Sequence, residues 1–366
     1  MELRRHQNAG SRGQDARATA GETPTLRALV LAIIVLAAVT QCAGESSGKL
    51  YEFSLPRMGT TLRVKLYAAN ATEANRAANA VFDRVEELEQ IFSDYRDDSE
   101  LTQLSRHGAD APRVVSPEMF ELLDDSARIS ALSGGAFDVT IGPLVALWRE
   151  ARRTRVMPDP AALTRARTAV GYQNIELDRQ NHTVFLKRSD MKLDVGAIGK
   201  GYAAEQAVAL LRSRGIQRAL AAAGGDMRIG APPPGKSGWE IAIDSPDIPA
   251  AGKPCVLSLH DVAISTSGNS HQFVESNGRH WSHIVDPATG WALEGAASST
   301  VIAPDGATAD GLATALSVMP PEKGLKAVES QEGVSAYLVR QSPEGWRYYT
   351  SRGFPRGCHE NTQGGR

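Results

Sequence analysis

The stretch Leu193–Gly215, LDVGAIGKGYAAEQAVALLRSRG, joins an expected strand at 183–187 to an expected helix from Gly201 to Arg214. Gly215 follows the helical residues, at a position where glycine commonly terminates a helix. Three glycines precede or open the helix, and their bare N–H groups, together with the charge of Lys200, favour an anion. The spacing is neither a Walker A loop nor GxGxxG, so the pattern fits a phosphate site and a plain strand-to-helix turn alike.

The segments before this stretch predict one strand and two helices. Alternating apolar residues at 61–67 indicate a half-buried strand. Thr72 is the predicted cap of a helix whose apolar residues recur at helical spacing, namely Ala74, Ala77, Ala78, Val81, Val85, Leu88 and Phe92. A second helix is predicted to open at Ser116-Pro117-Glu118 and to close at Gly134-Gly135.

The segments after it are mostly strands. We expect strands at 239–243, 262–265 and 299–303, a helix from Thr308 to Leu316, and a hairpin formed by 334–340 and 346–350. Strands and helices are mixed without strict βαβ alternation, which predicts an α+β fold with mixed sheets and packed helices. We assign residues 49–352 to the folded domain and residues 353–366 to a polar, frayed tail.

Composition narrows the function classes. The chain has 366 residues, of which 42% are hydrophobic and 22% charged, as is typical of a globular protein. Its formal net charge of −2 lacks the basic excess of a nucleic-acid binder, so we expect no nucleic-acid partner.

The N-terminus indicates export. The uncharged apolar run Ala28–Val39 follows Arg27 and is short for a membrane span, so residues 1–48 are predicted to be a signal-peptide or lipoprotein-type leader and linker. An uncleaved anchor helix is the alternative. Cys42 lies where a lipoprotein signal places its acylated cysteine, although Gln41 precedes it where a small residue is usual. We expect a periplasmic protein attached to the inner membrane, with anchoring through lipidated Cys42 left open.

The three cysteines, Cys42, Cys255 and Cys358, are too widely spaced for a zinc site. In an oxidising compartment Cys255 and Cys358 can form a disulfide, and two unpaired thiols fit the sequence equally well.

Two sets of polar residues are candidates for chemistry. Asp310 and Thr314 are four residues apart on the predicted helix, so that both oxygens face one way, as a Mg²⁺ site requires. An aspartate near a helix start is also commonly a cap. His283 can act as a general base, because the pKa of histidine is near working pH, or it can be a structural histidine. Asp286 follows it in the stretch His283–Gly290.

Eight segments occur in an informative order. They are Met58–Thr60 (MGT), Phe92–Leu101 (FSDYRDDSEL), Ser133–Leu144 (SGGAFDVTIGPL), Leu193–Glu205 (LDVGAIGKGYAAE), Gly224–Asp226 (GGD), Ser265–Gly268 (STSG), Ser282–Gly290 (SHIVDPATG) and Ala309–Leu316 (ADGLATAL). Together they resemble the ApbE family, whose members are FAD:protein FMN transferases. The resemblance implies that family's two-subdomain α+β architecture.

The resemblance also implies site residues. Carried over position by position, the FAD contacts are Met58, Tyr95, Ala136, Phe137, Asp138, Asp194, Lys200 and Val285. The implied Mg²⁺ ligands are the backbone carbonyl of Ala197 and the side chains of Asp310 and Thr314. Gly199 stands where the family usually has alanine, a change that removes neither a ligand nor a charge.

The implied reaction is phosphoryl transfer with Mg²⁺ and with FAD as the FMN donor. A threonine hydroxyl of an acceptor flavoprotein, such as a redox-pump or electron-transfer subunit, attacks the FMN-side phosphorus, and AMP leaves. His283 is the first choice of base and Asp286 the second. Two alternatives remain on sequence alone, namely an FAD pyrophosphatase and a periplasmic FAD-binding protein without turnover. The Asp310/Thr314 pair argues against the binding protein, because a carrier needs no metal at the pyrophosphate.

Overall fold

The computed structural model describes residues 48–243, 245, 254–268, 273–276, 278–356 and 358. The predicted leader lies outside the described residues, apart from Gly48, and Cys42 lies outside them with it. Contacts group residues 47–366 into one compact unit. Among the described residues, no helix has both the length and the apolar character needed to cross a membrane.

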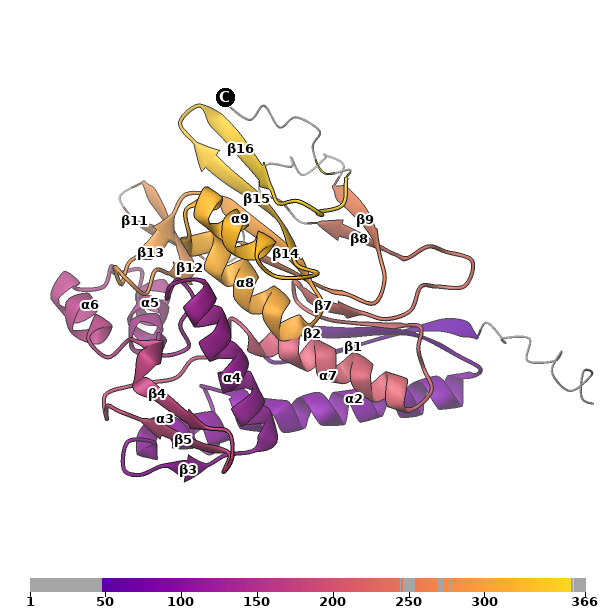
Figure 1. The fold of residues 1–366 in the computed structure, drawn as a ribbon, viewed down its shortest axis with the longest axis horizontal. Coiled ribbons are helices and arrows are strands. Elements are labelled where there is room, and N and C mark those ends of the chain that lie inside the picture. Colours follow the sequence, from indigo (N-terminus) through magenta and orange to yellow (C-terminus); the bar gives the residue numbers. More distant parts are fainter. Residues whose placement is uncertain are drawn as a thin grey trace, which may run out of the picture. The chain divides into compact units, whose positions relative to one another are not determined.

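An eight-stranded sheet forms the centre of the unit (Figure 1). Its strand order is β1-β2-β6-β7-β10-β14-β15-β16, and each pair of neighbours is antiparallel. The strands are β1 (Lys49–Arg57), β2 (Thr60–Ala68), β6 (Ala219–Ala223), β7 (Asp226–Ile229), β10 (Ala263–Gly268), β14 (Ala297–Ala303), β15 (Ser335–Ser342) and β16 (Gly345–Thr350). The predicted strands at 61–67 and 299–303 and the predicted C-terminal hairpin are confirmed within this sheet.

Helices cover one face of the sheet. They are α2 (Ala71–Phe92), α7 (Gly199–Ser213), α8 (Gly306–Val318) and α9 (Pro321–Glu329), which contact successive strands from β1 to β16. The alternation of β6 shows both faces: Ala219, Ala221 and Ala223 belong to the core under the helices, whereas Leu220 and Ala222 belong to a second core. The sheet is therefore buried on both sides.

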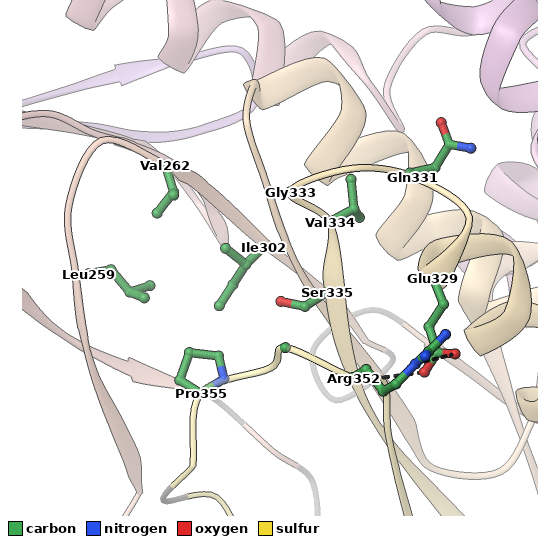
Figure 2. Close-up of a pocket in the computed structure, with 11 residues that line it drawn as sticks. Leu259, Val262, Ile302, Glu329, Gln331, Gly333, Val334, Ser335, Arg352 and Pro355 are labelled. Atoms are coloured by element: carbon green, nitrogen blue, oxygen red, sulfur yellow. Dashed lines mark hydrogen bonds and ion pairs between the residues drawn. The ribbon is translucent and has the colours of Figure 1, made fainter.

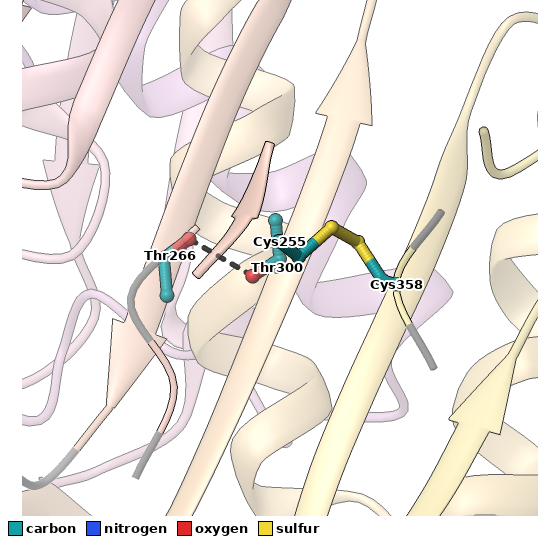
Figure 3. Close-up of a disulfide and its surroundings, with 4 residues drawn as sticks. All are labelled: Cys255, Thr266, Thr300 and Cys358. Carbon is teal, nitrogen blue, oxygen red and sulfur yellow. Dashed lines mark hydrogen bonds between the residues drawn. A yellow bond between two sulfur atoms is a disulfide. The ribbon is translucent and has the colours of Figure 1, made fainter. Parts of the chain in front are cut away.

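The second core lies under β8 (Trp239–Ile243) and β9 (Cys255–Leu259). Cys255 of β9 forms a disulfide with Cys358, which decides between the two states that the sequence left open (Figure 3). Phe354 is buried and stacks on Tyr337, and Cys358 is buried too. The described part of the predicted frayed tail is therefore packed, because a buried aromatic ring and a covalent link attach it to the core.

The remaining elements lie beside this body. They are α3 (Glu100–His107), β3 (Arg113–Val114), α4 (Pro117–Leu132), α5 (Gly142–Thr154), α6 (Pro160–Arg167), the short 3-10 helix η1 (Tyr172–Asn174), β4 (Ile175–Asp178), β5 (Thr183–Leu186), β11 (Phe273–Ser276), β12 (Arg279–Val285) and β13 (Ala292–Glu294). Trp148 of α5 is fully buried in a third core, and its indole donates to the carbonyl of Gly290.

Local chemistry explains where the helices begin. The seven apolar residues predicted for α2 are its seven buried residues. The predicted cap at Thr72 is wrong, because Asn70 accepts from the N–H of Glu73 and starts the helix two residues earlier. Ser116 caps α4 as predicted, by accepting from Met119. The helix expected from Gly201 begins at Gly199, which places Lys200 in the first turn of α7.

Candidate active site

The N-terminal turns of α7 and α8 meet at a cluster of three charged side chains, in which the two carboxylates are buried and the lysine is half-buried. Asp310, on α8, accepts from the backbone N–H of Gly201 at 3.0 Å and is 3% exposed. The ammonium group of Lys200 lies 2.5 Å from Asp226 Oδ2 and 3.5 Å from Asp310 Oδ2. Asp226, at the start of β7, also accepts from the hydroxyl of Ser265. Two helices, α7 and α8, and two strands, β7 and β10, thus converge on one point.

The charges of this cluster do not cancel. Burial is the main cause that raises the pKa of Asp310, and the neighbouring Asp226 raises it further. Burial alone lowers the pKa of a lysine, but Asp226 and Asp310 outweigh it and raise the pKa of Lys200. When both carboxylates are ionised, they and the ammonium group carry one net negative charge, which favours an added cation over a bare anion. The positive charge of Lys200, which the sequence predicts to face a phosphate, is therefore compensated by Asp226 and Asp310.

The predicted metal ligands fit a hard cation in their chemistry. Asp310 supplies a carboxylate and Thr314, half-buried on the same helix, supplies a hydroxyl four residues later. Ala197 lies two residues before α7, so its carbonyl belongs to the loop that leads to the cluster. Oxygen ligands with one carboxylate suit Mg²⁺, which retains several waters. The described residues contain no cluster of three His, Cys, Asp or Glu side chains, so a transition-metal site of that kind is not seen there.

Met58 reaches the same region from the β1–β2 turn. Met58 and Gly59 both have positive φ, 50° and 69°, as the two central residues of a tight hairpin turn require. The N–H of Met58 donates to Glu89 of α2 at 2.9 Å. A Cβ added to Gly199 would lie 3.9 Å from Met58 Cε, so the methionine lies against the first turn of α7.

Asp194 and Tyr95 are connected through a residue that sequence analysis did not single out. Arg149 of α5 donates to Asp194 Oδ2 at 2.9 Å and to Asp94, and its guanidinium lies 4.5 Å from the centroid of the Tyr95 ring. Asp194 Oδ1 accepts from the N–H of Gly196 and so shapes the loop before α7. Tyr95 remains 78% exposed. The arginine joins two segments that are about a hundred residues apart in the sequence.

The Ala136–Asp138 segment turns out to be mostly structural. The Asp138 carboxylate accepts from the N–H and hydroxyl of Thr140 and from the N–H of Tyr172, and burial raises its pKa. The Phe137 side chain is 2% exposed and lies in the main core. Ala136 is half-buried. A contact from Phe137 to FAD would therefore have to come from its main chain.

His283 and Asp286 occupy different environments. His283 is half-buried on β12, where the pairing with β13 shifts register between Trp281 and Val285. Such irregularities often re-aim side chains beside active sites. Asp286 accepts from the N–H of Ala288 and the hydroxyl of Thr289, so its carboxylate holds the turn that follows. Val285 is buried in the third core and, like Phe137, offers only its main chain.

A cavity among the described residues lies elsewhere. It encloses about 570 Å³, and its walls include Leu259, Val262 and Ile302, with the Glu329–Arg352 ion pair at one side (Figure 2). Leu259 and Ile302 belong to or border the second core, on the face of the sheet opposite α7 and α8. No predicted site residue lines this cavity.

Comparison with known proteins identifies the family of this chain. The model of the ApbE family matches residues 58–338, which is more than half of the chain. The chain belongs to the ApbE family. The match begins at Met58 and includes every site residue carried over from the resemblance.

Individual ApbE relatives align with this chain along most of their length. Proteins named FAD:protein FMN transferase from Vibrio cholerae and Treponema pallidum are 30% and 32% identical to this chain. The alignments cover 88% and 84% of this chain, and 97% and 89% of those proteins.

Solved ApbE structures have the same fold. The flavin transferase ApbE from Vibrio cholerae superimposes with a TM-score of 0.74 at 29% identity, over 83% of this chain and 98% of that chain. The ApbE protein from Thermotoga maritima gives 0.74 at 28% identity, over 85% and 100%. The predicted α+β fold and the family resemblance are confirmed.

Proposed function

We propose that this protein is a Mg²⁺-dependent FAD:protein FMN transferase that attaches FMN to a threonine of an acceptor flavoprotein and releases AMP. The transferase class follows from family membership. The observation that supports the chemistry best is the Lys200–Asp226–Asp310 cluster at the N-terminus of a helix, which is net negative when both carboxylates are ionised.

The chain's own residues have separable roles in this proposal. His283 accepts the proton of the threonine hydroxyl as its oxygen forms a bond to the FMN-side phosphorus. The bond from that phosphorus to the AMP-side oxygen breaks, and the electron pair leaves with AMP. The first turn of α7, with Met58 against it, orients the pyrophosphate. Lys200 holds Asp226 and Asp310 together.

Asp310, Thr314 and the Ala197 carbonyl would hold the metal. When bound, Mg²⁺ neutralises the charge of the pyrophosphate and stabilises the leaving oxygen. The charge of the cluster supports this metal role: with both carboxylates ionised and no cation bound, Asp226 and Asp310 would repel the pyrophosphate more strongly than Lys200 attracts it.

The test is incubation of the purified chain with FAD, Mg²⁺ and an acceptor domain, followed by intact mass of the acceptor. We expect the acceptor to gain one FMN per target threonine and one AMP to be released for each FMN attached. An acceptor with valine in place of that threonine is the control. Release of AMP and free FMN at the same rate with and without acceptor would instead identify an FAD pyrophosphatase.

We also propose that the chain is exported, becomes periplasmic and is attached to the inner membrane. The apolar run Ala28–Val39 and the position of Cys42 support this proposal. Cell fractionation with mass analysis of the mature N-terminus tests it. Full-length protein in the cytoplasmic fraction would exclude export, and an acylated N-terminal Cys42 would support lipidation.

A further inference from the structure

Arg149 has three partners from two distant segments. Its guanidinium donates to Asp94 and to Asp194, and it lies over the ring of Tyr95. Asp94 and Tyr95 follow the end of α2, whereas Asp194 belongs to the loop before α7. One side chain of α5 therefore sets the position of the exposed tyrosine relative to the loop that leads to the charged cluster.

The burial of the two carboxylates makes this bridge strong. The side chains of Asp94 and Asp194 are only 12% and 9% exposed. Burial raises the pKa of Asp194, and the negative charge of Asp94 raises it further, whereas Arg149 opposes both. Without the guanidinium, two nearly buried carboxylates would repel each other, and the two segments would separate.

Tyr95 has the features of a stacking platform. The Tyr95 ring is 78% exposed, so it is open to a planar ligand, and aromatic rings pack favourably against other rings. The cation on one side fixes the ring and leaves the rest of its surface to a ligand. The N–H of Tyr95 also donates to the hydroxyl of Ser93, which holds the backbone of this turn.

We propose that Arg149 is a positioning residue for FAD: it holds Tyr95 as a platform on which one planar ring of FAD stacks, in register with the Asp194 loop. This inference rests on the proposed function, because it requires Tyr95 to lie in the FAD site. The planar ring is either the isoalloxazine or the adenine of FAD. Binding of FMN, which contains only the isoalloxazine, and of AMP, which contains only the adenine, distinguishes the two.

The experiment compares Arg149→Gln, Tyr95→Leu and the double variant in the chain without its leader. Arg153→Gln is the matched control, because Arg153 is on the same helix, is 72% exposed and pairs with Glu150. Calorimetric titration measures Kd for FAD, FMN and AMP, and steady-state transfer separates KM from kcat. We expect Arg149→Gln to weaken FAD binding by roughly tenfold, with kcat at saturating FAD nearly unchanged. The effect of the double variant on Kd should be smaller than the product of the two single effects, because both changes remove the same Tyr95 platform.

Each other result is decisive. If Tyr95→Leu binds FAD like the wild type, the site is misplaced and the FAD contacts of the proposed function must be revised. If Tyr95→Leu weakens binding but Arg149→Gln matches Arg153→Gln, the positioning role is wrong while the function stands. Should Arg149→Gln fail to fold, Arg149→Lys keeps a charge but cannot bridge both carboxylates while lying flat on the ring. Wild-type FAD affinity in that variant would overturn the proposal.

Discussion

Gly201 and Gly306 are in direct backbone contact where α7 and α8 meet. A Cβ added to Gly201 would lie 2.1 Å from the carbonyl oxygen of Gly306, and one added to Gly306 would lie 2.0 Å from that of Gly201. No side chain fits at either position. This contact lets the N–H of Gly201 reach the Asp310 carboxylate.

Gly201→Ala should therefore damage both the fold and the site. The helices must separate, because the clash is with backbone atoms, and overpacking of this kind costs about 1–3 kcal/mol. Differential scanning calorimetry should show a lower Tm. The rate of FMN transfer should also be lower at temperatures below the new Tm, where the variant is folded. Gly199→Ala is the control, because Gly199 is also in the first turn of α7 and a Cβ added there would make only ordinary contacts, 3.8 Å from Val195 Cγ2 and 3.9 Å from Met58 Cε. An unchanged rate in Gly201→Ala would show that the contact is dispensable.

Asp310→Ala should abolish transfer and leave the fold intact. Asp310 is the one carboxylate among the three proposed metal ligands, and loss of such a preorganised group lowers rates by about 100-fold or more. The free energy of unfolding should change by no more than about 1–2 kcal/mol, because the substitution also removes a buried charge. Flavin fluorescence on the acceptor, at saturating FAD and varied Mg²⁺, measures the effect. Asp190→Asn, a surface carboxylate paired with Arg188, is the control. Wild-type rate and Mg²⁺ dependence in Asp310→Ala would mean that the metal site is misplaced.

His283→Gln should lower kcat by about 10²- to 10⁴-fold, the usual contribution of a general base. Binding of FAD should be unaffected, because the proposed partner of His283 is the acceptor hydroxyl. Stopped-flow transfer with titration of FAD separates the two quantities. A normal kcat would remove His283 from the mechanism.

Asp286→Ala should act on stability rather than on chemistry. Its carboxylate accepts two hydrogen bonds within its own turn, and their loss costs about 1–3 kcal/mol. The Tm should fall, while kcat per folded molecule should stay within a few-fold of the wild type. A loss of kcat as large as that of His283→Gln, without a lower Tm, would instead make Asp286 the base.

Replacement of Cys255 and Cys358 by serine should lower stability without loss of activity. The disulfide closes a loop with a sequence separation of 103, and the chain-entropy model gives about 4–5 kcal/mol for a loop of that length. It lies on the second core, on the other face of the sheet from α7 and α8. Denaturant unfolding is measured for the wild type without reductant, for the wild type with reductant and for the double variant. The last two samples should lose the same free energy of unfolding relative to the first. Equal stability of all three samples would contradict it.

Local sequence was enough to predict much of the fold. The apolar spacing of α2 identified its seven buried residues, because helical period alone decides which side chains face the sheet. Ser116-Pro117 marked the start of α4 for a similarly local reason. Thr72 was assigned wrongly because Asn70, two residues earlier, also has a capping side chain, and the sequence cannot rank the two.

Ordered motifs along the chain were enough to predict the family and the residues Asp310, Thr314 and Lys200. Only the tertiary structure showed that Asp226 and Asp310 compensate the charge of Lys200. It also showed that the Asp138 carboxylate accepts from the distant Tyr172, whereas that of Asp286 holds its own turn. The link from Tyr95 to Asp194 through Arg149 likewise appears only in the folded chain. The physical reason is distance along the chain. Caps and periodicity depend on residues within one or two turns, whereas the charge state and partners of a buried group depend on segments that only the folded chain brings together.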